Sequence, residues 1–371
     1  MHFPLQKVYE FFYFLYENNM PITPSPFALK KRSLLKELGP NIVDLTISSP
    51  MQAGISLDIA DDLRYLAENP GWQFKAPDAC GQICARKAIA TYMQCDENDI
   101  FITSSSSESY SVLFQVFCKK GDCILTPVPG YPLIDTLAEL AELNTHPYFL
   151  KPNKDHWEID LDSLDSAPPN AKILLLIAPH NPTGHIPSKK EFEHILQFCE
   201  KNKLALIIDG VFYAYGPSYE IPHEYKVPIF FLDGLSKTAG LPHVKVGWIN
   251  AIVPEKKNIY DALEYVLDSQ LNCSYLSQAL CARVLPRVEE FQQRLIERLK
   301  TSRVWLGDYF SKMGAEIIPS AGGWYQSFYF PGADDEELCL RLLKENKILT
   351  NPGFLFDFDD GWLVCSLLYY P

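Results

Sequence analysis

Through the middle of the chain, short apolar runs alternate with stretches whose apolar residues recur at helical spacing. Six runs rich in Val, Ile, Leu and Phe lie at 99–105, 122–129, 171–179, 204–210, 227–236 and 246–253. Nearly continuous apolar runs of this length are typical of strands buried on both faces of a parallel sheet. The helical patterns between them lie at 106–121, 132–144 and 188–203, and Ser188 three residues before Glu191 has the spacing of a capping box. This alternation predicts an α/β domain in which helices flank a mainly parallel sheet.

The pattern changes after residue 253. A long helical region covers roughly 261–313, and two short strand patterns follow at 323–331 and 361–370, separated by a helical pattern at 334–347. Helices segregated from neighbouring antiparallel strands predict a smaller α+β domain. Because residues 1–45 contain no sheet of their own, we assign them to the same domain. The expected division is a large domain at 46–280 and a small domain formed by 1–45 and 281–371.

Composition and charge argue against a nucleic-acid-binding protein and against a membrane protein. The 371 residues exceed what one core comfortably holds, and 47% of them are apolar, as in a soluble globular protein. The net charge of −13 argues against a nucleic-acid binder, which needs a basic face. The aromatic segment 9–19 is too short and too interrupted to cross a bilayer, and it lacks the layout of a signal peptide. We therefore expect no membrane or nucleic-acid partner and a cytoplasmic location.

The ten cysteines show neither a paired metal-binding spacing nor a dense disulfide pattern. Cys80 and Cys84 are the closest pair, and a helix would simply place them on one face. Reduced thiols and no metal site are the expected state.

Candidate chemistry follows four of the predicted strands, at the edge where open α/β sheets bind their ligands. The hydroxyl-rich segment 103–110 offers N–H and hydroxyl donors to a phosphate, although an ordinary helix cap has the same composition. Asn181 lies in a rigid loop with two prolines, which is also a common turn. Asp209 closes a buried strand, where a carboxylate needs a cation, donors or a helix to cap.

Lys237 follows the fourth strand, between small residues. A lysine forms an imine only as the neutral amine, so burial or a nearby cation such as Lys245 would activate it. Most lone lysines are surface charges, and it is the combination of four such segments that favours chemistry here.

These segments resemble a known family. The order of "PGYP", "NPTG", "IID", "SK" and "GW" is similar to that of the aspartate aminotransferase superfamily, which has fold type I and uses pyridoxal 5′-phosphate (PLP). The resemblance covers about residues 42–368. It implies a sheet of the seven-stranded type in the large domain, and a small-molecule amino or oxo substrate. The segment Gly81–Ala90 resembles the family's helix near the dimer interface, so the resemblance also implies a homodimer with active sites at that interface.

The resemblance assigns a role to each site residue. Lys237 would form the internal aldimine and then shuttle the proton, and Asp209 would pair with the pyridinium nitrogen. Asn181 would donate to the ring hydroxyl oxygen, and Tyr131 would stack on the ring face. The residues expected around the phosphate are Ser105, Ser106, Ser107, Ser236 and Lys245.

Several positions depart from the family pattern. Aligning "GWLVCSLL" puts Cys365 where the family has the arginine that binds the substrate carboxylate, and a thiol cannot replace that contact. Phe212 stands where a tyrosine is usual, with Tyr213 next to it. Other departures are Gly234 in place of a serine, Lys245 in place of an arginine, Phe74 near the position of the partner subunit's aromatic, and an end at Pro371 where relatives usually add a helix.

The expected function is transfer of an amino group between an amino acid or amine and an oxo acid. Because the carboxylate anchor is missing, a PLP-dependent lyase or decarboxylase and a non-catalytic PLP-fold sensor remain alternatives. A nicotinamide-dependent oxidoreductase would need a glycine fingerprint after an early strand, which this sequence lacks. The aromatics Tyr131, Phe212, Tyr213 and Trp324 favour an apolar or aromatic substrate. If the anchor is simply missing, Cys365→Arg should improve ordinary amino acids as substrates.

Overall fold

The computed structural model describes residues 25–370 except 75, 221–225 and 272. The aromatic segment 9–19 and the terminal Pro371 lie outside the described residues. Among the helices described, none is both long enough and apolar enough to cross a membrane.

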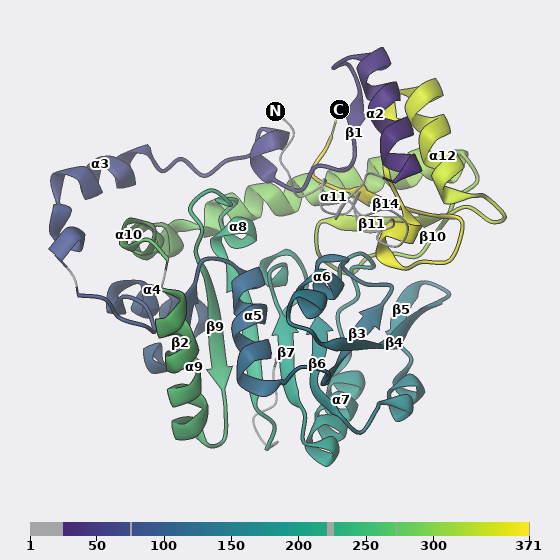
Figure 1. Cartoon of the computed structure of the whole chain (residues 1–371). Helices are drawn as coiled ribbons and strands as arrows, with labels where there is room; N and C mark the ends of the chain where they lie inside the picture. The colour runs from purple at the N-terminus through teal and green to yellow at the C-terminus, as the bar shows by residue number, and fades with distance from the viewer. Residues whose placement is uncertain (1–24, 75, 221–225, 272, 371) are drawn as a thin grey trace, which may run out of the picture.

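An eight-stranded sheet forms the centre of the molecule (Figure 1). Its order is β2-β9-β8-β7-β6-β3-β4-β5. The strands span Ile100–Thr103 (β2), Gly247–Ile252 (β9), Ile229–Gly234 (β8), Ala205–Asp209 (β7), Ala171–Ile177 (β6), Cys123–Val128 (β3), Asn144–Asn153 (β4) and His156–Ile159 (β5). From β8 to β4 all neighbours are parallel, whereas β9 is antiparallel to both β8 and β2. The predicted mainly parallel sheet is confirmed.

The strands β4 and β5 were not predicted from the apolar runs. They pair antiparallel at the edge of the sheet, and buried and exposed residues alternate along much of their length. Tyr148 and Leu150 are buried, whereas Phe149 between them is 41% exposed. Strands covered on one face show only an alternation of apolar and polar residues, which is a weaker signal than a continuous apolar run. With β5 the sheet has one strand more than the expected seven-stranded type.

Helices cover both faces of the sheet. Along β6, Leu174 and Leu176 pack in one apolar cluster with α7 (Lys189–Asn202). The alternate residues Ile173 and Leu175 pack in a second cluster with α5 (Ser106–Phe117), α6 (Leu133–Leu140) and α9 (Lys256–Gln270). Burial on both faces explains why the strands are continuously apolar in sequence. The predicted capping box of Ser188 and Glu191 begins α7.

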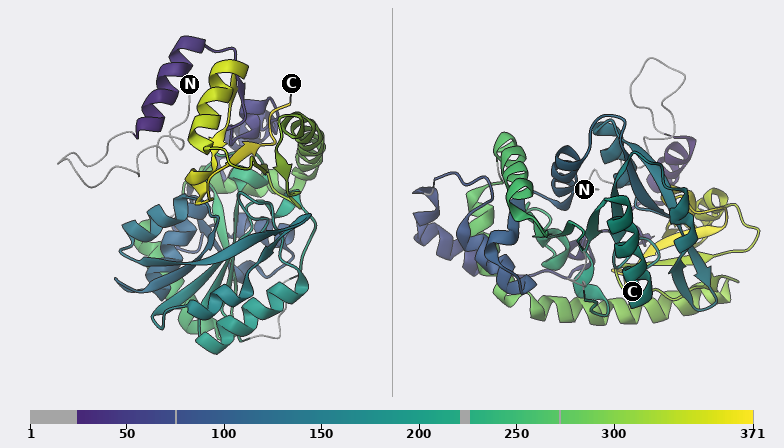
Figure 2. Two further views of the ribbon diagram at one scale, coloured as in Figure 1. Left: turned by 90° about the vertical axis from the view of Figure 1, so that its right-hand side faces the viewer. Right: turned by 90° about the horizontal axis from the view of Figure 1, so that it is seen from below.

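The helical region at 261–313 is divided into three helices. They are α9, α10 (Tyr275–Val284) and α11 (Glu289–Lys312), and a short 3-10 turn containing Pro286 separates the last two. Proline cannot donate the backbone hydrogen bond that a continuous helix needs, so the break lies there. Helix α11 runs along one side of the molecule and reaches the C-terminal strands (Figure 2).

A second sheet contains the C-terminal strands. Its order is β10 (Glu316–Ile317), β11 (Tyr325–Tyr329), β14 (Trp362–Ser366) and β13 (Asn351–Pro352), all antiparallel. Nearby lie α12 (Asp335–Arg341) and α2 (Pro26–Leu38), and β1 (Val43–Asp44) pairs with β12 (Ile348–Leu349). The domain bounds 46–280 and 1–45 with 281–371 stay a prediction.

Candidate functional site

The predicted site residues are brought to one edge of the large sheet. Strands β3, β6, β7 and β8 run parallel, and β2 runs the same way because two antiparallel pairings separate it from β8. Their carboxyl ends therefore meet at one edge. The segments that leave those ends carry Ser105, Tyr131, Asn181, Asp209 and Lys237.

Lys237 lies in the four-residue helix α8 (Leu235–Thr238), directly after β8. Its Nζ donates to the backbone oxygen of Ser48 at 2.9 Å. The same Nζ lies 4.8 Å from the ring centroid of Trp324 and 5.6 Å from that of Phe212. Although part of the side chain is exposed, burial of the amine lowers the pKa of Lys237 to about 8, against an opposing effect from Asp209.

Asp209 is 6% exposed at the end of β7. The hydroxyl of Tyr110 donates to its Oδ2 at 2.6 Å, and the N–H of Val211 donates to its Oδ1 at 3.1 Å. Burial raises the pKa of Asp209, while these two donors and Lys237 act in the opposite direction. The carboxyl group is thus held in place from two sides.

Asn181 follows β6 and is 5% exposed. Its Oδ1 is buried without a hydrogen-bond partner in the part of the chain that the structure describes. An unpaired buried acceptor costs roughly 1–3 kcal/mol, which a bound donor would offset. Tyr131 follows β3 and is partly buried there.

The hydroxyl segment forms the N-terminus of α5. Ser105 caps the helix, because its side chain accepts from the N–H of Glu108, and Ser106 and Ser107 begin the first turn. A Cβ at Gly247 of β9 would lie 2.6 Å from the backbone carbon of Ser105, so only glycine permits this approach. Capping by Ser105 does not exclude anion binding at this helix end. The first backbone N–H groups of a helix have no partner within the helix, so those that Ser105 does not cap can bind an anion.

The two remaining phosphate candidates are placed differently. Ser236 lies in α8 beside Lys237 and is partly exposed. Lys245 is exposed and has a left-handed backbone with φ of 59°. The roles of both at a phosphate stay predictions.

Phe212 and its neighbours form an aromatic wall beside Lys237. Phe212 is 3% exposed and packs on Trp324 and Tyr325, with ring centroids 5.4 Å and 6.1 Å away. Tyr213 points elsewhere, and its hydroxyl donates to the backbone oxygen of Tyr219 at 3.4 Å. No hydroxyl of residues 212 or 213 therefore reaches Lys237.

The expectation that Cys365 stands at the position of the carboxylate-binding arginine is wrong, because side chains alternate between the two faces of the second sheet. Cys365 pairs with Gln326, whereas Ser327 pairs with Val364. The hydroxyl of Ser327 donates to the backbone oxygen of Pro182, so the face of Ser327 and Val364 is the one turned toward the Asn181 loop. Cys365 lies on the opposite face, is fully buried, and has its pKa raised by burial and by Cys339 of α12.

Sequence reasoning missed three groups at this site. Tyr110 was seen only as part of the hydroxyl segment, Ser48 was not considered, and Asp233 was read as part of an apolar strand. The carboxyl of Asp233 accepts from the N–H of Gly234 and the hydroxyl of Thr238, and burial raises its pKa to about 8. A charged residue inside the apolar run at 227–236 was the available signal for it, whereas nothing local indicated the other two.

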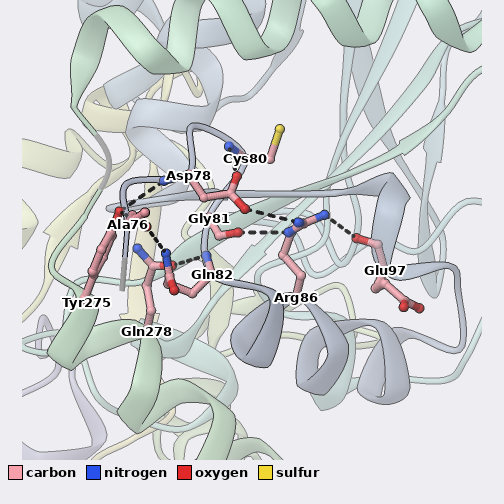
Figure 3. Close-up of polar contacts among 9 residues, drawn as sticks. All are labelled: Ala76, Asp78, Cys80, Gly81, Gln82, Arg86, Glu97, Tyr275 and Gln278. Carbon is pink, nitrogen blue, oxygen red and sulfur yellow. Dashed lines mark hydrogen bonds and ion pairs between the residues drawn. The ribbon is translucent and has the colours of Figure 1, made fainter. Parts of the chain in front are cut away.

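The segment Gly81–Ala90 forms most of α4 (Ile83–Met93), which packs against α10. Figure 3 shows the polar contacts that hold the preceding loop. Arg86 donates to the backbone oxygens of Gly81 and Glu97, and the N–H of Gln82 donates to the side chain of Gln278 at 2.6 Å. The side chain of Phe74 lies outside the described residues.

Comparison with known proteins adds three findings. A model of the family aminotransferase class I and II matches residues 49–366. Nicotianamine aminotransferase 1 of Oryza sativa subsp. japonica is 28% identical over 75% of this chain and 61% of that enzyme, and tyrosine aminotransferase of Mus musculus is 25% identical over 94% and 79%. The solved structure of alanine aminotransferase from Pyrococcus furiosus superposes with a TM-score of 0.82 at 21% identity, covering 92% of this chain and 91% of that one.

Proposed function

Because the chain belongs to the class I and II aminotransferases, a PLP-dependent family, we propose that it transfers an amino group between a small amine or amino acid and an oxo acid, with Lys237 as the reacting amine. The observation that carries the proposal is the position of this lysine. Its amine is buried, has a pKa of about 8, and lies in the electrostatic reach of Asp209. Near pH 8 about half of such amines are neutral and able to attack a carbonyl.

The residues present fit PLP. Asp209 is a buried carboxyl able to hold a protonated ring nitrogen, and Asn181 has an unpaired buried oxygen whose amide could turn to the ring hydroxyl. The N-terminus of α5 packs closely on the backbone of Gly247, which holds Ser105 in place. Tyr131 would lie on the ring face, and the phosphate would be held by Ser105, Ser106, Ser107, Ser236 and Lys245.

Each residue then has a defined task. When bound, PLP supplies a carbonyl that condenses with amines and a ring that accepts the electron pair of the bond being broken. Asp209 would present a negative charge to the ring, and Tyr110 holds its Oδ2 at 2.6 Å. The neutral Lys237 amine would accept the proton from the donor carbon and later supply the proton that the acceptor carbon gains, because general bases work best with a pKa near the working pH.

The first test is an absorption spectrum of the purified chain with PLP, beside Lys237→Ala and the control Lys189→Ala. Lys189 has an 86% exposed side chain. We expect a visible band that requires Lys237 and survives in the control. Bleaching by an amine donor, with recovery on adding an oxo acid, supports amino transfer. Release of ammonia or a fragment with no acceptor supports the lyase alternative, and a band that no amine changes supports the sensor.

The same proposal includes a homodimer in the cytoplasm. Exposed large apolar side chains gather on three helices that pack together, α3 (Ala60–Glu68), α4 and α10. These side chains are Leu63, Tyr65, Ile83 and Leu276, each 37–46% exposed. A second copy of the chain would cover them. All ten cysteines are free thiols, as expected in a reducing compartment.

A further inference from the structure

The surroundings of the Lys237 amine attract cations and repel anions. The Nζ contacts a backbone carbonyl oxygen of Ser48 and two aromatic faces, Trp324 and Phe212. The face of an aromatic ring carries a negative quadrupole and binds ammonium groups. A carbonyl oxygen is likewise an acceptor for an ammonium, so a carboxylate placed at this wall would be repelled by each group that lines it.

Among the described residues, no lysine or arginine other than Lys237 lies over the rings of Trp324 and Phe212. The charged side chain that opposes the fall in the pKa of Lys237 is Asp209, which is itself negative. The face of the second sheet that is turned toward the site carries Tyr325, Ser327, Val364 and Ser366, and none of these can bear a positive charge. A buried carboxylate without a cation is strongly disfavoured, because it loses its water and gains no paired charge.

We propose that the donor substrate is a primary amine with an apolar or aromatic body and no carboxylate on the carbon that bears the amine. This inference rests on the proposed function and names the substrate class of that same site. The carbonyl oxygen of Ser48 accepts a hydrogen bond from the incoming ammonium, and Trp324 and Phe212 cover its apolar body.

The overall reaction is balanced without an added oxidant. The C–N bond of the amine breaks, its carbon loses two electrons and one hydrogen, and water supplies the oxygen of the aldehyde or ketone that is released. The acceptor enters the same site, so it is an oxo acid whose carboxylate is not on the carbonyl carbon. The amino group passes to it through the cofactor, its carbonyl carbon gains two electrons and one hydrogen, and its oxygen leaves as water.

The decisive experiment replaces Lys237 with alanine and measures whether a free amine binds in the space that the lysine side chain leaves. In cofactor-free Lys237→Ala, 2-phenylethylamine can occupy the position of the missing Nζ. We expect it to raise the melting temperature and to bind at least about ten-fold more tightly than L-phenylalanine, which differs from it only by the carboxylate, a difference of about 1.4 kcal/mol. The matched carboxylate 3-phenylpropanoate should give no shift. The wild-type chain is the control, and 2-phenylethylamine should not raise its melting temperature, because its own Nζ fills the position.

Equal or tighter binding of L-phenylalanine, or no binding of 2-phenylethylamine, overturns the proposal. A second arm titrates the PLP-loaded wild-type chain with the same two probes and follows its visible band, with the same ten-fold preference expected. If no band that depends on Lys237 forms, the proposed function fails, and the cofactor-free arm still decides whether the wall selects amines.

Discussion

At the scale of single residues, burial and neighbouring groups decide the chemistry. A lysine at the protein surface keeps its proton until well above neutral pH, whereas Lys237 has a pKa of about 8 because its amine is largely removed from water. Tyr110 has the complementary effect on Asp209, since its hydrogen bond favours the charged carboxylate that burial disfavours. The two groups are thereby kept near the ionisation states that the proposed reaction needs.

We predict that Lys237→Met stabilises the cofactor-free chain at pH 7. Because the folded pKa of about 8 lies below the ordinary value of 10.5, the protonated amine disfavours folding at pH 7 by at most about 3 kcal/mol. This cost falls as the pH rises from about 8 toward 10.5, where the folded chain has released the proton and the unfolded chain follows. Urea unfolding of both chains at pH 7, 9 and 10 should show a shrinking difference.

Two results bear on this prediction. The exposed Lys189→Met should change the free energy of unfolding by less than about 0.5 kcal/mol at each pH. A difference between Lys237→Met and the wild type that stays constant from pH 7 to pH 10 would show that the amine is not desolvated in the folded chain.

At the scale of elements, most predicted strands and helices are confirmed. Continuous apolar runs identified β6, β7 and β8 because both of their faces are buried, and the capping box located the start of α7. The strand β4, next to the edge strand β5, escaped prediction since only one face is covered. In β14 the alternation of the pleat, which depends on pairing with β11, decides that Val364 and not Cys365 is turned toward the site.

Cys365→Arg therefore should not create a carboxylate anchor. The side chain at 365 is fully buried on the face turned away from the site, so an arginine there adds bulk and an unpaired charge to the core. We expect a loss of roughly 3 kcal/mol or more in the free energy of unfolding and no improvement with amino acids. Cys365→Ala should cost about half as much and leave the amine preference unchanged. A stable Cys365→Arg chain with better amino-acid turnover would contradict this placement.

At the scale of the whole molecule, the site is assembled from distant parts of the chain. Ser48 is fixed near the second sheet, because the N–H of Ser366 donates to the nearby Leu45 oxygen, and its own oxygen holds Lys237 of the large sheet. Helices α3, α4 and α10, which carry the exposed apolar side chains, lie at the opposite end of the molecule from α12 (Figure 1). A homodimer formed through this face would leave the second sheet free.

We predict that Ile83→Glu weakens the dimer at least about ten-fold. Ile83 is 46% exposed on α4, and a carboxylate there would lose its water when a second copy covers it. Val304→Glu on α11 is the matched control, because Val304 is 75% exposed and lies on a different helix. Light scattering after gel filtration gives the mass of each. Equal dissociation of both variants, or a wild-type monomer, would remove this face as the interface.

The sequence by itself determined the fold class and the order of the candidate site residues. Both depend on local patterns, namely apolar runs, helix caps and the residue type that follows each strand. Only the tertiary structure decided which groups meet. Tyr110 and Asp209 are 99 positions apart, and Ser48 and Lys237 are 189 apart. Contacts at such separations depend on how the sheets and helices pack, which no local pattern encodes, and they determine the pKa of the lysine and the cation-attracting wall around it.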